Sequence, residues 1–175
     1  MEALRLPRRV EDEPGAAHLA SELASRSQPL WARGELRVPR AEVAPELEAA
    51  LKSAFSAGQI VRGLADAERA LAAEEQGLRL VDQKTGVERG RRVSRLLVLA
   101  DDGAERFYRS VESLLRRHGP RVLALRLSAD EYALGQLLFG PDQVARLLLV
   151  EHKDAVSEVL LALAAQWNSD DGPRG

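Results

Sequence analysis

The stretch SRLLVLA, residues 94–100, is a continuous apolar run that polar residues bound on both sides. A run of this kind is typical of a strand that is buried on both faces of a sheet. RVLALRL at 121–127 and VARLLLVE at 144–151 repeat the pattern, and QIVR at 59–62 is a shorter strand candidate. These runs predict a central sheet of about four strands, which must be covered on both sides.

Helical periodicity fills the intervals between the predicted strands. Apolar residues recur at the spacing of a helix face in 41–58, 66–77, 104–119 and 153–167. Ser128 and Glu131 form a Ser-x-x-Glu capping box at the start of a further helix. Helices therefore alternate with strands, which predicts one α/β domain over residues 42–167, a three-layer α/β/α sandwich with a mixed sheet.

The ends of the chain and one internal segment lack this regularity. Residues 1–41 contain four prolines and the charged stretch LPRRVEDEPG, so we interpret them as a flexible or loosely docked N-terminal extension. Residues 77–95 include Lys84-Thr85-Gly86, a turn signal, and are interpreted as an inserted hairpin or flap. The last residues, 168–175, are expected to form a disordered tail.

Composition excludes several classes of function. The 25 basic and 27 acidic residues leave a net charge of -2, so any nucleic-acid site must be a local patch. The chain has no cysteine, and its three histidines show no metal-ligand spacing, so no metal is expected. No signal-peptide or membrane-spanning run is present, which favours a cytoplasmic protein without a membrane partner.

Catalytic motifs are also missing from the sequence, and neither an enzyme nor a cofactor is expected. Asp101 and Asp102 follow the first long strand, where a carboxylate pair can support acid/base or metal chemistry. In that position such residues more often cap the next helix. An enzyme acting near this pair is the weaker alternative.

Two basic features remain as candidate sites. VERGRRVSR, residues 87–95, holds four arginines that either contact phosphates or belong to a solvated loop: Arg89, Arg91, Arg92 and Arg95. The second feature is Arg62-Gly63, which precedes a helix N-terminus whose free N–H groups suit an anion. The alternative is that Asp66 satisfies those groups and pairs with Arg69 three residues later.

The order of elements and several local stretches resemble a known family. The matching stretches are APELEAALKSAFSAGQIVRGLADAERALA at 44–72, RLLVLADD at 95–102 and RRHGPRVLALRLSADEYALG at 116–135. They are similar to the kink-turn RNA-binding ribosomal proteins, the L-seven-Ae group with its bacterial Ylx-type relatives. The chain resembles a divergent member, with Ala65 where the family typically has Asn.

The resemblance implies an α/β/α sandwich that binds a sharply bent RNA internal loop. By position, Gly63 would let the RNA backbone approach, and Arg62 would meet a phosphate. Asp66 and Arg69 would contact base pairs from the helix start. Phe139, Gly140 and Pro141 would form the later loop, where Phe139 either covers an extruded base or fills the core at a helix end.

These observations favour a non-enzymatic RNA-binding or ribosome-associated protein that acts in translation. The expected partner is structured RNA, with ribosomal RNA a candidate and ribosomal or other proteins as further partners. The alternative is a protein–protein interaction module that has the same fold and has lost RNA binding. The net negative charge and Ala65 favour that alternative, and the sequence does not indicate an oligomeric state.

Overall fold

The computed structural model describes residues 4–85 and 92–170, which form a three-layer α/β/α sandwich, as predicted. The sheet has six strands, in the order β1-β2-β5-β4-β6-β3, instead of the four expected. The strands are β1 (Ser27–Pro29), β2 (Arg37–Ala41), β3 (Ile60–Arg62), β4 (Arg95–Leu99), β5 (Val122–Leu127) and β6 (Leu147–Val150). The sheet is mixed, because β5 is parallel to β2 and β4 while β6 is antiparallel to β4 and β3.

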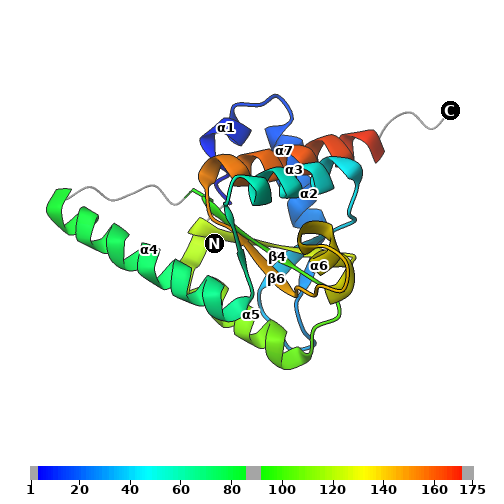
Figure 1. Cartoon of the computed structure of the whole chain (residues 1–175). Helices are drawn as coiled ribbons and strands as arrows, with labels where there is room; N and C mark the ends of the chain where they lie inside the picture. The colour runs from blue at the N-terminus through cyan, green and yellow to red at the C-terminus, as the bar shows by residue number, and fades with distance from the viewer. Residues whose placement is uncertain (1–3, 86–91, 171–175) are drawn as a thin grey trace.

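Helices cover both faces of the sheet (Figure 1). One face carries α1 (Arg8–Glu11), α2 (Ala16–Ser25), α3 (Pro45–Ser56), α6 (Glu131–Phe139) and α7 (Lys153–Asp170). The other face carries α4 (Leu64–Thr85) and α5 (Glu105–His118), and the short helix η1 (Gly119–Arg121) leads into β5. The apolar run that predicted β4 alternates between these two cores, since Leu96 and Val98 face one layer while Leu97 and Leu99 face the other.

The N-terminal segment differs from the loosely docked extension that the sequence suggested. It supplies two helices and two strands, and β2 pairs in parallel with β5 through Arg40↔Arg126 and Ala41↔Leu127. Its apolar side chains are buried in both cores: Leu6, Val10, Leu19, Leu23, Leu30, Val38 and Ala41. The prolines were misleading because Pro29 lies in the edge strand β1, where a missing N–H is tolerated, and Pro39 lies in β2 just ahead of Arg40 and Ala41, the residues that pair with β5.

The predicted hairpin or flap over 77–95 is also corrected. Helix α4 continues past Gly77 to Thr85, and β4 begins at Arg95. A glycine inside a helix costs about 1 kcal/mol, which good helix formers on both sides can offset. Residues 86–91 lie outside the described residues. The distal half of α4 extends beyond the body of the domain (Figure 1), and the Leu80 side chain there is 54% exposed.

Helix α7 continues through Asn168 and Ser169 to Asp170, beyond the predicted start of the tail, and residues 171–175 lie outside the described part of the chain. Within the described residues, no helix has both the length and the apolar character that a membrane crossing requires.

A buried carboxylate attaches the loop after β1 to helix α5. Glu112 accepts hydrogen bonds from the Trp31 indole at 3.0 Å, the Glu35 amide at 3.3 Å and the Arg116 guanidinium at 3.2 Å. Burial alone would raise the pKa of Glu112, but these donors outweigh burial and hold the pKa below its ordinary value of 4.5. The ionised form is therefore the one that the folded state stabilises.

We expect Glu112→Gln to lower the free energy of unfolding by about 1 kcal/mol at pH 7. Because the folded pKa is depressed, the stabilisation by Glu112 is fully present above the unfolded pKa and is lost as the pH falls through the folded value. The variant should therefore approach the unmodified protein in stability in acid. Urea unfolding at pH 7 and at more acidic pH measures this, with Glu105→Gln, an exposed position on the same helix, as the control. An equal loss for Glu112→Gln at every pH would contradict the role given to the charge.

Candidate functional site

The sheet register separates the predicted site residues into two groups. Arg62 ends β3 opposite Leu148 of β6, whereas Arg95 begins β4 beside Val122 of β5. Because β4 and β6 are antiparallel and Leu99 pairs with Leu147, Arg62 and Arg95 lie at opposite ends of the strands. Arg62 is level with Leu148 and Val98, so three residues of strand, about 10 Å, separate it from the level of Arg95. We call the two ends of the strands the Arg62 end and the Arg95 end.

At the Arg62 end, the structure brings Arg62 and Phe139 together. The Arg62 guanidinium stacks 4.3 Å from the centre of the Phe139 ring and donates to the Val144 carbonyl. The Phe139 ring also meets Phe55 edge-on at 5.2 Å and packs against the core. Of the two roles considered for Phe139, this packing favours filling the core at the end of α6. Arg62 is correspondingly engaged with its own protein.

Gly63 explains how β3 passes directly into α4. Its φ of +94° is a conformation that favours glycine, and its N–H donates to the Leu147 carbonyl at 2.9 Å. The glycine is therefore needed for the turn itself, whether or not a ligand approaches. On the first turns of α4, Arg69 pairs with Asp66, as the structural alternative predicted. Asp66, however, is not placed as a cap, because the helix begins two residues before it.

The carboxylate pair at the same end has structural partners. Asp101 accepts from the Arg40 guanidinium at 2.9 Å, and Asp102 accepts from the Glu131 amide at the start of α6 at 3.1 Å. The capping box predicted from Ser128 is displaced, since Asp130 is the residue that caps α6. A cleft at the Arg95 end, between α4 and the body of the domain, is lined by neither Asp101 nor Asp102.

The predicted arginine cluster is only partly described. Arg89 and Arg91 lie outside the described residues. Arg92 donates to the Leu6 carbonyl at 3.1 Å and pairs with Glu11, which joins the residues just before β4 to the N-terminal segment. Arg95 pairs with Glu74 of α4 at 2.8 Å. These two arginines therefore join elements of the fold as well as lying at its surface.

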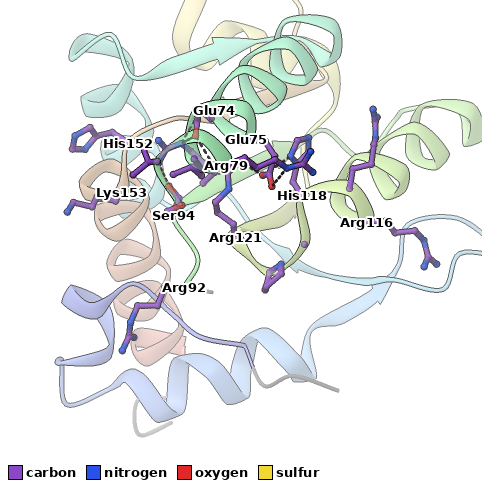
Figure 2. A pocket seen from close by; sticks show the side chains of 17 residues that line it. Glu74, Glu75, Arg79, Arg92, Ser94, Arg116, His118, Arg121, His152 and Lys153 are labelled. Carbon is purple, nitrogen blue, oxygen red and sulfur yellow. Dashed lines mark hydrogen bonds and ion pairs between the residues drawn. The ribbon is translucent and has the colours of Figure 1, made fainter. Parts of the chain in front are cut away.

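A larger basic feature, which we call the basic cleft, lies at the Arg95 end between α4 and the body of the domain (Figure 2). Its volume is about 960 Å³. Seven of its lining side chains are basic: Arg79, Arg92, Arg95, Arg116, Arg117, Arg121 and Lys153. The described residues that line it include two carboxylates, Glu74 and Glu75. In Figure 2, Arg121 lies between Arg92 and Arg116.

The floor of the basic cleft is an ion-pair network. Arg121 donates to Glu74 at 2.8 Å and to Glu75 at 3.4 Å, and its side chain is only 16% exposed. His118, 7% exposed, places Nδ1 3.7 Å from the Glu75 carboxylate, a distance beyond hydrogen bonding. Burial and the neighbouring Arg121 charge lower the pKa of His118, so the imidazole is neutral at neutral pH. The ion pairs of the floor therefore stabilise the packing of α4 against η1 and add little net positive charge to the cleft.

The rim of the basic cleft is different, because its cations reach solvent. The side chains of Arg79, Arg116 and Arg117 are 76%, 49% and 60% exposed. Arg79 lies 4.0 Å from Glu75 and Arg117 lies 3.7 Å from Glu68, so both have loose carboxylate partners. Exposed pairs of this kind are worth about 0–1 kcal/mol, and an incoming anion can replace the carboxylate at little cost.

Sequence reasoning missed most of this rim. Arg116 and Arg117 fall in the helix predicted over 104–119 and Arg121 begins the strand predicted over 121–127, yet RRHGPR at 116–121 is as rich in basic residues as the predicted cluster. The density of arginines in this stretch was the one local feature that could have indicated the rim of the basic cleft. The approach of α4 to this stretch, which makes a cleft of it, is a long-range contact that no local pattern reports. Among the described residues, no group of three His, Asp or Glu side chains is arranged to hold a metal.

Comparisons with known proteins add little. No family model and no curated protein matches the chain. One solved structure that resembles it is a protein with unknown function from Bacillus halodurans C, at 15% sequence identity and a TM-score of 0.44. The likeness covers 70% of this chain and 99% of that chain. At these values it supports no inference about function.

Proposed function

We propose that this protein binds structured RNA without catalysis, and that the basic cleft holds the phosphate backbone. The observation that carries the proposal is the set of seven Arg and Lys side chains around one cleft of about 960 Å³. A net charge of -2 gives the whole chain no attraction for a polyanion, so a local concentration of cations is what such binding needs. The resemblance of the sequence to kink-turn RNA-binding proteins supports RNA as the polyanion.

The chemistry of the rim suits phosphate. Guanidinium groups bind phosphate oxygens through two parallel hydrogen bonds, and Arg79 and Arg117 can exchange weak carboxylate partners for them. Phosphate contacts place an RNA without reading its sequence. With Ala65 in place of an amide at the start of α4, we expect strong salt dependence and little sequence discrimination.

The triple variant Arg79→Gln, Arg117→Gln, Lys153→Gln tests the proposal. Each lost phosphate contact lowers the slope of log affinity against log salt by about 0.7–0.9, so losing three should lower the slope by roughly 2–3 and the affinity by about 10- to 30-fold. The measurement is fluorescence anisotropy with a labelled RNA hairpin that carries an asymmetric internal loop, titrated at several salt concentrations.

The matched control removes three exposed cations elsewhere, with Lys52→Gln, Arg69→Gln and Arg106→Gln. Arg69 belongs to the Arg62 end, so this control also tests the site that the family resemblance implies. Unchanged binding in the control supports the basic cleft. Loss of binding in the control with retention in the cleft variant would place the RNA at the Arg62 end and contradict the proposal.

A protein–protein interaction module is the second candidate. It is favoured by the pairing of cleft arginines with carboxylates of their own chain, as in Arg116 with Glu35 at 2.8 Å and Arg95 with Glu74 at 2.8 Å. Paired charges of this kind weaken the local positive potential. Absence of RNA binding by the intact chain at low salt would favour this candidate.

A further inference from the structure

The basic cleft has an apolar wall that the binding of phosphates does not explain. Leu78 and Val81, from the distal half of α4, line the cleft together with Pro120 of η1. Leu80 belongs to the same stretch of helix but is not among the residues that line the cleft. The cleft therefore combines an apolar wall on α4 with cations from α5, η1 and the start of α7.

We infer that the basic cleft receives an unpaired nucleotide, with its base against Leu78 and Val81 and its backbone phosphates on the rim cations. The preferred ligand is then RNA with a bulged or single-stranded segment instead of a continuous duplex. This inference rests on the proposed function and adds to it the class of RNA.

The shape of the cleft supports an unpaired nucleotide. A volume of about 960 Å³ lies at the upper end of the roughly 300–1,000 Å³ range of small-ligand sites. Such a space holds nucleotide units, whereas an A-form helix keeps its bases stacked inside and offers the protein its phosphates and shallow minor groove. A duplex lying on the rim would leave the apolar wall in contact with water.

The chemistry of the wall leads to the same ligand. Covering apolar side chains is favourable by about 25 cal/mol per Å² of apolar surface removed from water. The face of a base can cover Leu78 and Val81, whereas a charged phosphate would lose water against these apolar side chains without gaining a hydrogen bond. Arg116 and Arg117 at the rim add guanidinium planes on which bases also stack. The two kinds of surface in the cleft thus correspond to the two parts of a nucleotide.

Three RNA probes of matched length and labelling test the inference: a perfect duplex, a hairpin with a bulge, and a single strand. The intact protein should bind the bulged or single-stranded probe about 10-fold more tightly than the duplex, because only an unpaired base can cover Leu78 and Val81. The double variant Leu78→Ala, Val81→Ala should remove most of that difference. It should leave the salt slope unchanged, because the phosphate contacts remain.

Leu80→Ala is the matched control, since it removes an exposed leucine from the same turn outside the cleft. Leu78→Met keeps the apolar volume and should retain the preference, which separates loss of the wall from damage to the helix. Circular dichroism and thermal unfolding verify that each variant is folded.

The outcomes separate this inference from the proposed function. One outcome is that the duplex binds as tightly as the bulged RNA and the double variant Leu78→Ala, Val81→Ala has no effect. If the triple variant Arg79→Gln, Arg117→Gln, Lys153→Gln still weakens binding, the proposed RNA-binding function stands and the inference of an unpaired nucleotide is wrong. If none of the probes binds, both are wrong. If Leu80→Ala lowers affinity as much as the double variant, the base is not held in the cleft.

Discussion

Removal of residues 1–41 is expected to abolish the cooperative fold. This segment places Leu6, Val10, Leu19, Leu23 and Ala41 in the core between the sheet and α7. Each Leu or Val among them contributes about 1.5–3 kcal/mol by burial, so their combined loss is comparable with the roughly 5–15 kcal/mol that stabilises a whole domain. The deletion also exposes the β5 edge that β2 covers, and an uncovered edge promotes aggregation.

Size-exclusion chromatography, far-UV circular dichroism and urea unfolding of the shortened chain measure this result. A point variant makes it quantitative: Leu19→Ala, at a side chain 1% exposed, should lower the free energy of unfolding by about 2–5 kcal/mol. Leu4→Ala, at 39% exposure in the same segment, should change it by no more than about 0.5 kcal/mol. If the shortened chain unfolds cooperatively with unchanged stability, the interpretation of residues 1–41 as a loosely docked extension would be correct after all.

The second large effect is expected at Gly135, in the middle of α6. A Cβ added there would lie 2.3 Å from the carbonyl oxygen of Gln143 and 2.6 Å from the Cα of Val144. Both obstacles are backbone, so neither can rotate aside, and α6 or the loop before β6 must shift. Gly135→Ala should therefore cost about 3 kcal/mol, the upper part of the range for overpacking.

Gly77→Ala is the matched control, because it makes the same substitution in another helix. A Cβ at Gly77 would meet no atom of the described residues within 4 Å. Alanine should stabilise α4 by about 0.5–1 kcal/mol. Urea unfolding of the two variants should thus give changes of opposite sign. Two changes of the same sign would mean that helix propensity, and not the close approach of the 143–144 backbone, decides the outcome at Gly135.

The layered fold could be predicted because its central strands are visible in local sequence. Leu96–Leu99 and Leu147–Val150 are buried on both faces, and this requires consecutive apolar residues. Strands β1 and β2 carry no such run. Strand β2 is recognised by its pairing with β5, whose partner residues lie some eighty positions later in the chain. Three polar or proline residues in β1, and a β2 whose apolar residues are interrupted by Pro39 and Arg40, leave too weak a pattern to be read in isolation.

The candidate site was predicted less well, for a related reason. The sequence places Arg92 and Arg95 in one cluster with Arg89 and Arg91, and it joins Arg62 to the same hypothesis. The antiparallel register of β6 puts Arg62 and Arg95 at opposite ends of the sheet instead. Partners such as Glu74 for Arg95 and Phe139 for Arg62 are contacts between distant segments, and they decide which cations remain available to a ligand.

The sequence by itself determined the alternation of strands and helices and the apolar character of the central strands, whereas the need for glycine at position 63 became clear from its φ in the folded chain. The first two properties follow from local periodicity and from backbone sterics, which act between near neighbours in the chain. The tertiary structure alone decided that the N-terminal segment completes the sheet, and that α4 and the 116–121 stretch enclose a basic cleft with an apolar wall. Those features depend on register and packing between residues far apart in sequence, where burial and pairing are settled only once the whole chain is folded.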